Sequence, residues 1–498
     1  MRGRFWRWLS RLLELLAAVM VLRWLVLRLR RVLLLPTDDS TAPLGPDQVA
    51  PRMRRLIVSD LHLGAGDRLD DFQADQAFSA FVRSYALGHG PTDLILAGDT
   101  FEFLQVRLPD LSDYEWSGAA AERRLGVILA AHPEPIAALR AFVAAPGNQL
   151  TLLIGNHDFE LHYAAAKRLL FQSLGLAEGD RRLRFGISYE GGGLYLVHGN
   201  QFDRWNRFVR FEGISQPFEV VRGTRVVKDV INPLEDDPLD IAPQIDNVKP
   251  ASAFFWYLLA LPRLRRADVR RFVVRGLLLL FRSTGAGHGY AAGPVLEVRR
   301  ELLGNTAEAR PREAALEAIY ATEPALRQAA AAAHGGVEPE LPAQPRPDLD
   351  DYLRDLFGRL FQHEPEQAAE AQEELQREAA QQLDREIHAF NDAVTLAIAE
   401  IAAQPEHGAQ TLFVCGHTHL AQIVLLNERQ KYVNIGTWTA VLHQVADENG
   451  YEQRFPFLEV LYTPGSDEPQ AQFLVWSGAD APPQLWRDPD HGDKGEPS

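Results

Sequence analysis

Short apolar runs that end at polar residues recur along the chain, and each has the length of a β-strand. Five of them are Leu56 to Ser59, Leu94 to Ala97, Leu150 to Ile154, Leu194 to Val197 and Leu412 to Cys415. Apolar runs of this length, bounded by turn residues, are typical of buried strands. Stretches with helical periodicity, Asp71 to Leu87 and Pro135 to Ala144, separate the first three runs. This alternation of strands and helices predicts an α/β fold.

The long stretch between the fourth and fifth runs has a different composition. Residues 254–281 are aromatic and Arg-rich, residues 338–347 are Pro-rich, and residues 364–403 have the Glu, Gln and Ala content of one long helix. We interpret residues 205–407 as a helical insertion that caps the rest of the fold.

The strand pattern resumes after this insertion. Further strands are expected at Gln422 to Leu426, Tyr432 to Ile435, Phe457 to Tyr462 and Phe473 to Trp476. The main domain then comprises residues 52–204 and 408–480. The charged, Pro-containing residues 481–498 are typical of a disordered tail.

Residues 1–35 combine Leu, Val and Trp with scattered arginines. The longest uncharged run, Leu15 to Leu22, is too short to span a bilayer. Charged side chains share one side of the predicted helix: Arg4, Arg7, Arg11 and Glu14. This pattern favours a helix that lies in the membrane interface, and a helix packed on the protein itself or on a partner is the alternative. Residues 36–51, rich in Pro, Asp, Gly and Thr, then indicate a linker.

The net charge limits the classes of partner. A formal charge of −16 over 498 residues repels nucleic acid across most of the surface. Arginines nevertheless crowd the first 31 residues and the stretch from Arg263 to Arg282, which is typical of a surface facing anionic lipid or phosphate, although solvated helix faces have the same composition. The single cysteine, Cys415, excludes an intramolecular disulfide and a thiolate cluster, so His, Asp and Asn would have to bind any metal.

Candidate metal-binding side chains directly follow the first five apolar runs. The segments are Ser59-Asp60-Leu61-His62, Gly98-Asp99, Gly155-Asn156-His157-Asp158, Val197-His198-Gly199 and Gly416-His417-Thr418-His419. In an open α/β sheet, ligands bind at the carboxyl ends of the strands, so all five segments can converge. Asp-x-His and His-x-His place two side chains on the same side of an extended segment. The adjoining glycines are expected to permit the sharp bends that direct these side chains.

The motif order D-x-H, G-D, G-N-H-D, H-G and G-H-T-H resembles that of the calcineurin-like metallophosphoesterases. The resemblance implies a four-layer αββα sandwich and a centre of two divalent metals. The ligands it implies are Asp60, His62 and His419 for one metal, Asn156, His198 and His417 for the other, and Asp99 as a bridge between them. Oxygen and imidazole ligands without thiolate suit manganese, with iron or zinc as alternatives. Two cations about 4 Å apart can share a hydroxide that attacks phosphorus.

The same resemblance implies two catalytic residues. His157 would protonate the leaving oxygen and Asp158 would orient it, whereas in the alternative interpretation His157 only packs the loop. Supporting or substrate contacts are expected from Glu102, Asn200, Gln201 and Asp203.

The substrate is less clearly indicated than the reaction. Ser-Asp-Leu-His-Leu from Ser59 and Gly-Asp-Thr-Phe-Glu-Phe from Gly98 resemble the UDP-2,3-diacylglucosamine pyrophosphohydrolases of lipid A synthesis, although that branch has Arg in place of His157 and a smaller insertion. We expect a hydrolase of phosphate mono- or diester or pyrophosphate bonds that acts on a phosphorylated small molecule or a lipid-linked substrate, in the cytoplasm at the inner membrane. The acidic charge disfavours a nucleic-acid phosphodiesterase, and the intact ligand set disfavours a non-catalytic scaffold.

Overall fold

The computed structural model describes residues 34–49, 52–86, 90–203, 205–235, 377–379, 381, 391–442, 451–452, 454–463 and 468–487. Two predicted features lie largely outside these residues: the N-terminal helix and most of the insertion. The prediction that residues 481–498 form a disordered tail is wrong at its start, because Gln484–Leu485 form a strand paired with the large sheet, and residues 488–498 lie outside the described chain. Along the described chain no single helix is long and apolar enough to cross a membrane, although one bent pair, Gly118–Ala131 with Pro133–Ala144, passes on length and composition alone.

A seven-stranded sheet carries most of the main domain. Across the sheet its strands are β16 (Gln484–Leu485), β15 (Pro469–Val475), β14 (Pro456–Tyr462), β2 (Arg54–Val58), β3 (Thr92–Ala97), β4 (Gln149–Leu153) and β5 (Leu183–Gly186). The four strands from β2 to β5 are parallel, and β14 is antiparallel to β2. Every residue of β3 is buried, because a central parallel strand is covered on both faces.

A five-stranded sheet faces the first. Its strands are β10 (Gln422–Leu425), β11 (Lys431–Asn434), β9 (Leu412–Cys415), β7 (Leu194–Leu196) and β6 (Tyr189–Gly191). The central strands β7 and β9 pair in parallel although the predicted insertion separates them in sequence. Ile57 and Ile95 of the large sheet share one apolar core with Leu196 and Val414 of the small sheet.

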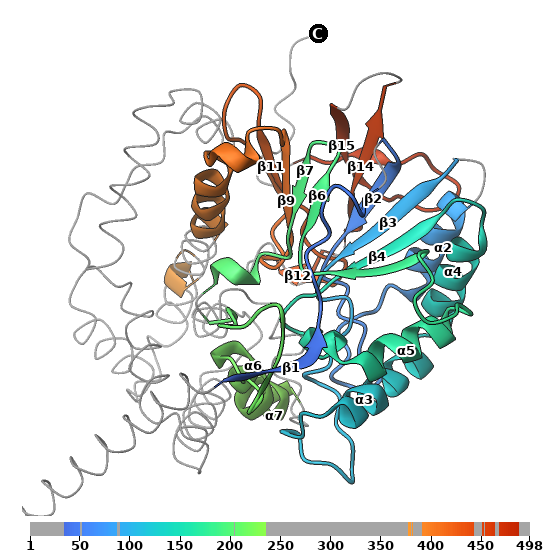
Figure 1. Cartoon of the computed structure of the whole chain (residues 1–498), viewed down its shortest axis with the longest axis vertical. Coiled ribbons are helices and arrows are strands. Elements are labelled where there is room, and N and C mark those ends of the chain that lie inside the picture. The colour runs from blue at the N-terminus through green and yellow to red at the C-terminus, as the bar shows by residue number, and fades with distance from the viewer. Residues whose placement is uncertain are drawn as a thin grey trace, which may run out of the picture.

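Helices cover both outer faces, so the predicted four-layer αββα sandwich is confirmed (Figure 1). The outer face of the large sheet carries α2 (Asp75–Ala86), α3 (Gly118–Ala131), α4 (Pro133–Ala144) and α5 (Ala164–Ser173). Helical residues 391–402 cover the small sheet through Val394 and Ile398. The remaining short elements of the domain are η1 (Phe159–His162), η2 (Asn200–Phe202), η6 (Pro405–His407) and the pair β12 (Val441–Leu442) with β13 (Tyr451–Glu452).

Helix α2 begins at Asp75 and not at Asp71 as predicted. The carboxylate of Asp70 accepts hydrogen bonds from the amides of Gly64, Gly66 and Phe72. These bonds hold the preceding residues as a loop, because an Asp side chain that binds nearby backbone amides competes with helix formation.

The described part of the expected linker, residues 36–49, is bound to the domain. Strand β1 (Leu35–Ser40) pairs antiparallel with β8 (Gly213–Gln216), which lies within the predicted helical insertion. The carboxylate of Asp39 accepts a hydrogen bond from the Ala164 amide at the start of α5, and Lys167 Nζ donates to Ser40 O. The polar residues that suggested a solvated linker therefore bind the domain.

The described start of the predicted insertion is also part of this body. After β8 it forms α6 (Arg222–Val226), one π-helical turn η3 (Val227–Ile231) and α7 (Asn232–Glu235). These elements lie beside β1 below the sheets in Figure 1.

Candidate metal centre

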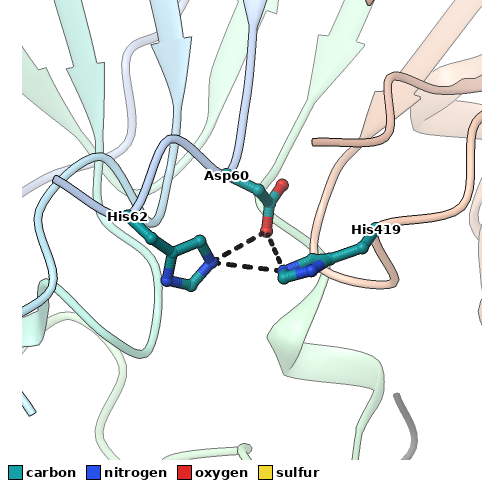
Figure 2. Close-up of side chains that lie close together, drawn as sticks. All are labelled: Asp60, His62 and His419. Atoms are coloured by element: carbon teal, nitrogen blue, oxygen red, sulfur yellow. Dashed lines mark hydrogen bonds and ion pairs between the residues drawn. The ribbon is translucent and has the colours of Figure 1, made fainter. Parts of the chain in front are cut away.

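The five motif segments meet at the carboxyl ends of β2, β3, β4, β7 and β9. Each segment leaves its strand and turns at this end of the two sheets, and the seven expected ligands are at most 3% exposed. Figure 2 shows three of them, Asp60, His62 and His419, pointing toward one another from two segments far apart in the sequence. Convergence at the strand ends therefore brings every expected ligand into one buried region.

Asp60, His62 and His419 form the first cluster. His62 Nε2 and His419 Nε2 are 3.2 Å apart, and they lie 3.9 and 3.3 Å from Asp60 Oδ1 (Figure 2). One oxygen and two imidazole nitrogens within 4.8 Å of one another can hold a metal ion. This is the ligand group that the sequence assigned to one metal.

Asp99, His198 and His417 form the second cluster. His198 Nε2 lies 2.9 Å from Asp99 Oδ2, while His198 Nδ1 donates to Ala97 O at 3.0 Å. That bond fixes the tautomer and leaves Nε2 as the ligand atom. His417 Nε2 lies 3.2 Å from Asp203 Oδ2, which in the same way favours Nδ1 as the ligand atom of His417.

Asn156 tests whether the second cluster fits a cation. Its side chain is buried, and its Oδ1 has no hydrogen-bond partner among the residues that the structure describes. A buried amide oxygen without a donor is costly, and a cation would offset that cost. The donor set of oxygens and imidazoles therefore fits a hard or borderline divalent metal.

The ligand backbones adopt a conformation that most side chains avoid. Along the described chain six residues other than glycine have a positive φ, and five of them are ligand candidates: Asp60 (54°), His62 (52°), Asp99 (48°), His417 (69°) and His419 (61°). Left-handed backbone in non-glycine residues costs energy and gathers at functional sites. The turns after β2, β3 and β9 are therefore shaped around the cluster.

The three adjoining glycines serve two different purposes. Gly98 has φ +96°, so it provides the bend that the sequence predicted. At Gly155 and Gly416 the requirement is space: a Cβ would lie 2.1 Å from Asp99 Oδ1 and 2.2 Å from Asp60 Oδ2, respectively. The missing side chains at these two positions leave room for the carboxylates.

Opposite charges stabilise the ionised carboxylates. Burial alone would raise the pKa of Asp60 and Asp99, but neighbouring histidines, His198 foremost, hold both pKa values well below the usual range. Burial would lower the pKa of His62, yet pairing with Asp60 and Glu102 raises it to about 10. Metal binding would replace these imidazole protons, because histidine binds metals in its neutral form.

Glu102, and not Asp158, contacts His157. His157 Nδ1 lies 2.5 Å from Glu102 Oε2, which also lies 2.8 Å from His62 Nδ1. Burial opposes ionisation of Glu102, but His157 and His62 lower its pKa to about 2, so the carboxylate accepts both bonds. Asp158 instead accepts hydrogen bonds from the Gly155 and Thr100 amides. The expected orienting role of Asp158 is therefore filled by Glu102.

Of the other expected supporting residues, one contacts a proposed metal ligand and two bind the neighbouring backbone. Asp203 contacts His417, whereas Asn200 donates to Asn206 O and Gln201 accepts from the Gly199 amide, so both of these stabilise the loop after His198. The sequence missed two supports of the G-H-T-H segment: Asn391 accepts from Thr418 Oγ1, and Asn434 donates to Gly416 O. Both lie outside the motifs, and no local pattern marks them.

Comparison with known protein families agrees with this geometry. Residues 53–271 match the family model of the calcineurin-like phosphoesterases, and no curated protein matches the sequence. The matched range ends before His417 and His419, which the structure brings to the same site. The chain therefore carries a calcineurin-like phosphoesterase domain over residues 53–271, which indicates a metal-dependent phosphoesterase.

Proposed function

We propose that the protein uses two divalent metal ions, manganese first, to hydrolyse a phosphate ester or pyrophosphate bond in a membrane-proximal or lipid-linked substrate. The observation that carries the metal assignment is the pair of buried clusters, Asp60 with His62 and His419, and Asp99 with His198 and His417. Asn156 would complete the second set, and Asp99 would serve both ions. Two cations held there would supply a nucleophile from water and neutralise phosphate charge.

His157 is the proposed general acid. Glu102 holds its Nδ1, which leaves Nε2 as the ring atom that can meet the leaving oxygen. The His157 amide donates to Asp99 Oδ1 at 2.8 Å, so the loop that carries the acid is fixed to a ligand of the metal centre. The position of the proposed acid is thereby coupled to the proposed metal ligand Asp99.

The arrangement of β1 supports a membrane-proximal substrate. This strand directly follows the predicted interfacial helix and pairs with β8 at the start of the insertion, in which arginines crowd the stretch from Arg263 to Arg282. Leu35 and Val209 are exposed by 63% and 65%. Strand β1 thus ties the chain that follows the Arg-rich N-terminal segment to the described start of the insertion, which supports a surface that meets lipid phosphates.

The UDP-2,3-diacylglucosamine type of substrate is the second candidate. The Gly-Asp-Thr-Phe-Glu-Phe segment that resembles this branch contains Glu102, which the structure places on His62 and His157. His157 itself departs from the branch.

Three experiments test the proposal. Chelated protein should regain hydrolysis of bis-p-nitrophenyl phosphate with added Mn²⁺, and no turnover with any divalent metal would refute the assignment. A panel of sugar-nucleotide lipids, nucleotides and oligonucleotides then identifies the substrate class. For the membrane, flotation of the full chain with anionic liposomes is compared with a chain that starts at residue 34, which retains β1. Equal flotation would exclude the N-terminal segment as the membrane anchor.

A further inference from the structure

The loop after β3 carries Glu102, whose carboxylate holds the proposed acid His157. It also connects this carboxylate to a segment much later in the chain. Glu102 is fully buried, and while its Oε2 receives His157 and His62, its Oε1 accepts a hydrogen bond from the Leu104 amide at 2.9 Å. The peptide group of Leu104 therefore fixes how the Glu102 carboxylate is turned.

Two side chains from the start of the insertion bind the carbonyl oxygen of Leu104. Lys228 Nζ donates at 3.1 Å and Asn232 Nδ2 donates at 3.0 Å. The two residues are four positions apart on one face of the η3–α7 segment, and they are 6% and 2% exposed.

Packing alone does not explain these residues. Burial of an ammonium group is expensive unless it is hydrogen-bonded, and an apolar residue would fill the same space without that cost. Burial lowers the pKa of Lys228 to about 8, despite the opposing charge of Glu160. A buried Lys and a buried Asn that converge on one carbonyl indicate that the position of that carbonyl matters.

Neighbouring contacts hold the segment against the same loop. Tyr114 Oη donates to Asp229 Oδ1 at 2.6 Å, Gln105 Nε2 donates to Glu235 Oε2 at 3.1 Å, and Lys228 Nζ lies 5.1 Å from the centre of the Trp116 ring. The π-helical turn that carries Lys228 is a rare element that frequently marks functional sites. These contacts place the segment against the chain between Leu104 and Trp116.

We propose that Lys228 and Asn232 are positioning residues that set the orientation of His157 through the Leu104 peptide and Glu102. The inference rests on the proposed role of His157 as general acid. It makes the start of the insertion part of the catalytic apparatus: a displacement of η3–α7 reaches the proposed acid His157 through Glu102. The same carboxylate also holds the proposed metal ligand His62, so turnover is compared at saturating Mn²⁺.

Leaving-group dependence separates this role from a structural one. Lys228→Met and Asn232→Leu each remove one donor, and Tyr114→Phe is the matched control, because it breaks a contact of the same segment that does not involve Leu104. Turnover of bis(aryl) phosphates is measured with 2,4-dinitrophenyl, p-nitrophenyl and phenyl leaving groups. A good leaving group needs little protonation, so we expect each donor variant to lose about tenfold in kcat with phenyl and less than about twofold with 2,4-dinitrophenyl. For Tyr114→Phe, kcat relative to the wild type should stay unchanged with all three leaving groups.

Hydrogen exchange gives a second readout that needs no metal or substrate. In metal-free protein the Leu104 amide should exchange faster in both donor variants than in Tyr114→Phe, because the peptide is less firmly held. If Lys228→Met fails to fold, as judged by thermal unfolding, Asn232→Leu carries both measurements.

The outcomes distinguish this inference from the function on which it rests. His157→Asn serves as the reference: if it lowers turnover equally for all leaving groups, the general-acid role of His157 is wrong. Suppose that the loss of turnover in His157→Asn does depend on the leaving group. The positioning role is then refuted if Lys228→Met and Asn232→Leu lose turnover equally for all leaving groups, or if hydrogen exchange at the Leu104 amide is unchanged in them. The same dependence in Tyr114→Phe would also refute it, because it would assign the effect to the whole interface.

Discussion

Glu102 Oε2 accepts two hydrogen bonds, one of 2.5 Å from His157 Nδ1 and one of 2.8 Å from Nδ1 of the proposed metal ligand His62. One carboxylate oxygen thus serves both the proposed acid and the first metal site. A change at Glu102 should therefore affect proton donation and metal affinity together.

Glu102→Gln tests this double role. We expect a loss of about 10- to 100-fold in activity or metal affinity, typical for a residue that supports a metal ligand. Activity at saturating Mn²⁺ and metal content by mass spectrometry should both fall. Full metal content together with full activity would contradict the shared role.

Asp99→Asn and His157→Asn should have different consequences. Loss of the Asp99 charge should abolish activity and metal content together, since this carboxylate is proposed to serve both ions. His157→Asn should keep both metals and lose about 10² to 10⁴ in rate, the range for acid–base groups. Metal content of the purified variants decides, and metal loss in His157→Asn would make His157 a structural residue.

Gly155→Ala tests the requirement for space at the centre. The added methyl group would lie 2.1 Å from Asp99 Oδ1, so the carboxylate must move, and we expect metal content to fall while the fold is retained. Gly126→Ala is the matched control: it lies in α3 with its nearest neighbour atom at 4.0 Å, and it should stabilise the protein by about 0.5–1 kcal/mol. Normal metal binding by Gly155→Ala would show that the loop can adjust.

His132 should make stability depend on pH. Burial lowers its pKa, but hydrogen bonds to Asp70 (2.9 Å) and Asp75 (2.8 Å) outweigh burial and raise it. A raised folded-state pKa means that the stabilisation is complete below the unfolded-state pKa of about 6.5 and is lost as pH rises through the folded-state value. Thermal unfolding of the wild type and His132→Gln, compared from pH 5.5 to 9, should differ most at acidic pH. A difference that is constant across this range would refute the assignment.

The elements nearest the site could be predicted well, because each consists of a buried strand ending at a chemically distinct motif. The strand at Leu412–Cys415 was predicted with its observed bounds, and the turn at Gly98 was predicted for the right reason. Both depend on local properties of the chain: apolar patterning in one case and backbone freedom in the other.

The remaining features depend on contacts between distant segments. Asp158 adjoins His157 in sequence, which made it the obvious partner, yet its carboxylate turns to the Gly155 and Thr100 amides. Residues 36–51 have the composition of a linker, and only the presence of β8 gives them a strand to pair with. No pattern within either segment carries that information.

The pairing of β1 with β8 has a mechanical consequence. A flexible connection would let the phosphoesterase domain rotate freely about any partner of residues 1–33. Strand β1 prevents this rotation because it pairs with β8. The hydrogen bonds of Asp39 with the Ala164 amide and of Ser40 O with Lys167 Nζ hold the end of the strand on the domain. An orientation imposed on the chain at the start of β1 is therefore transmitted directly to the domain.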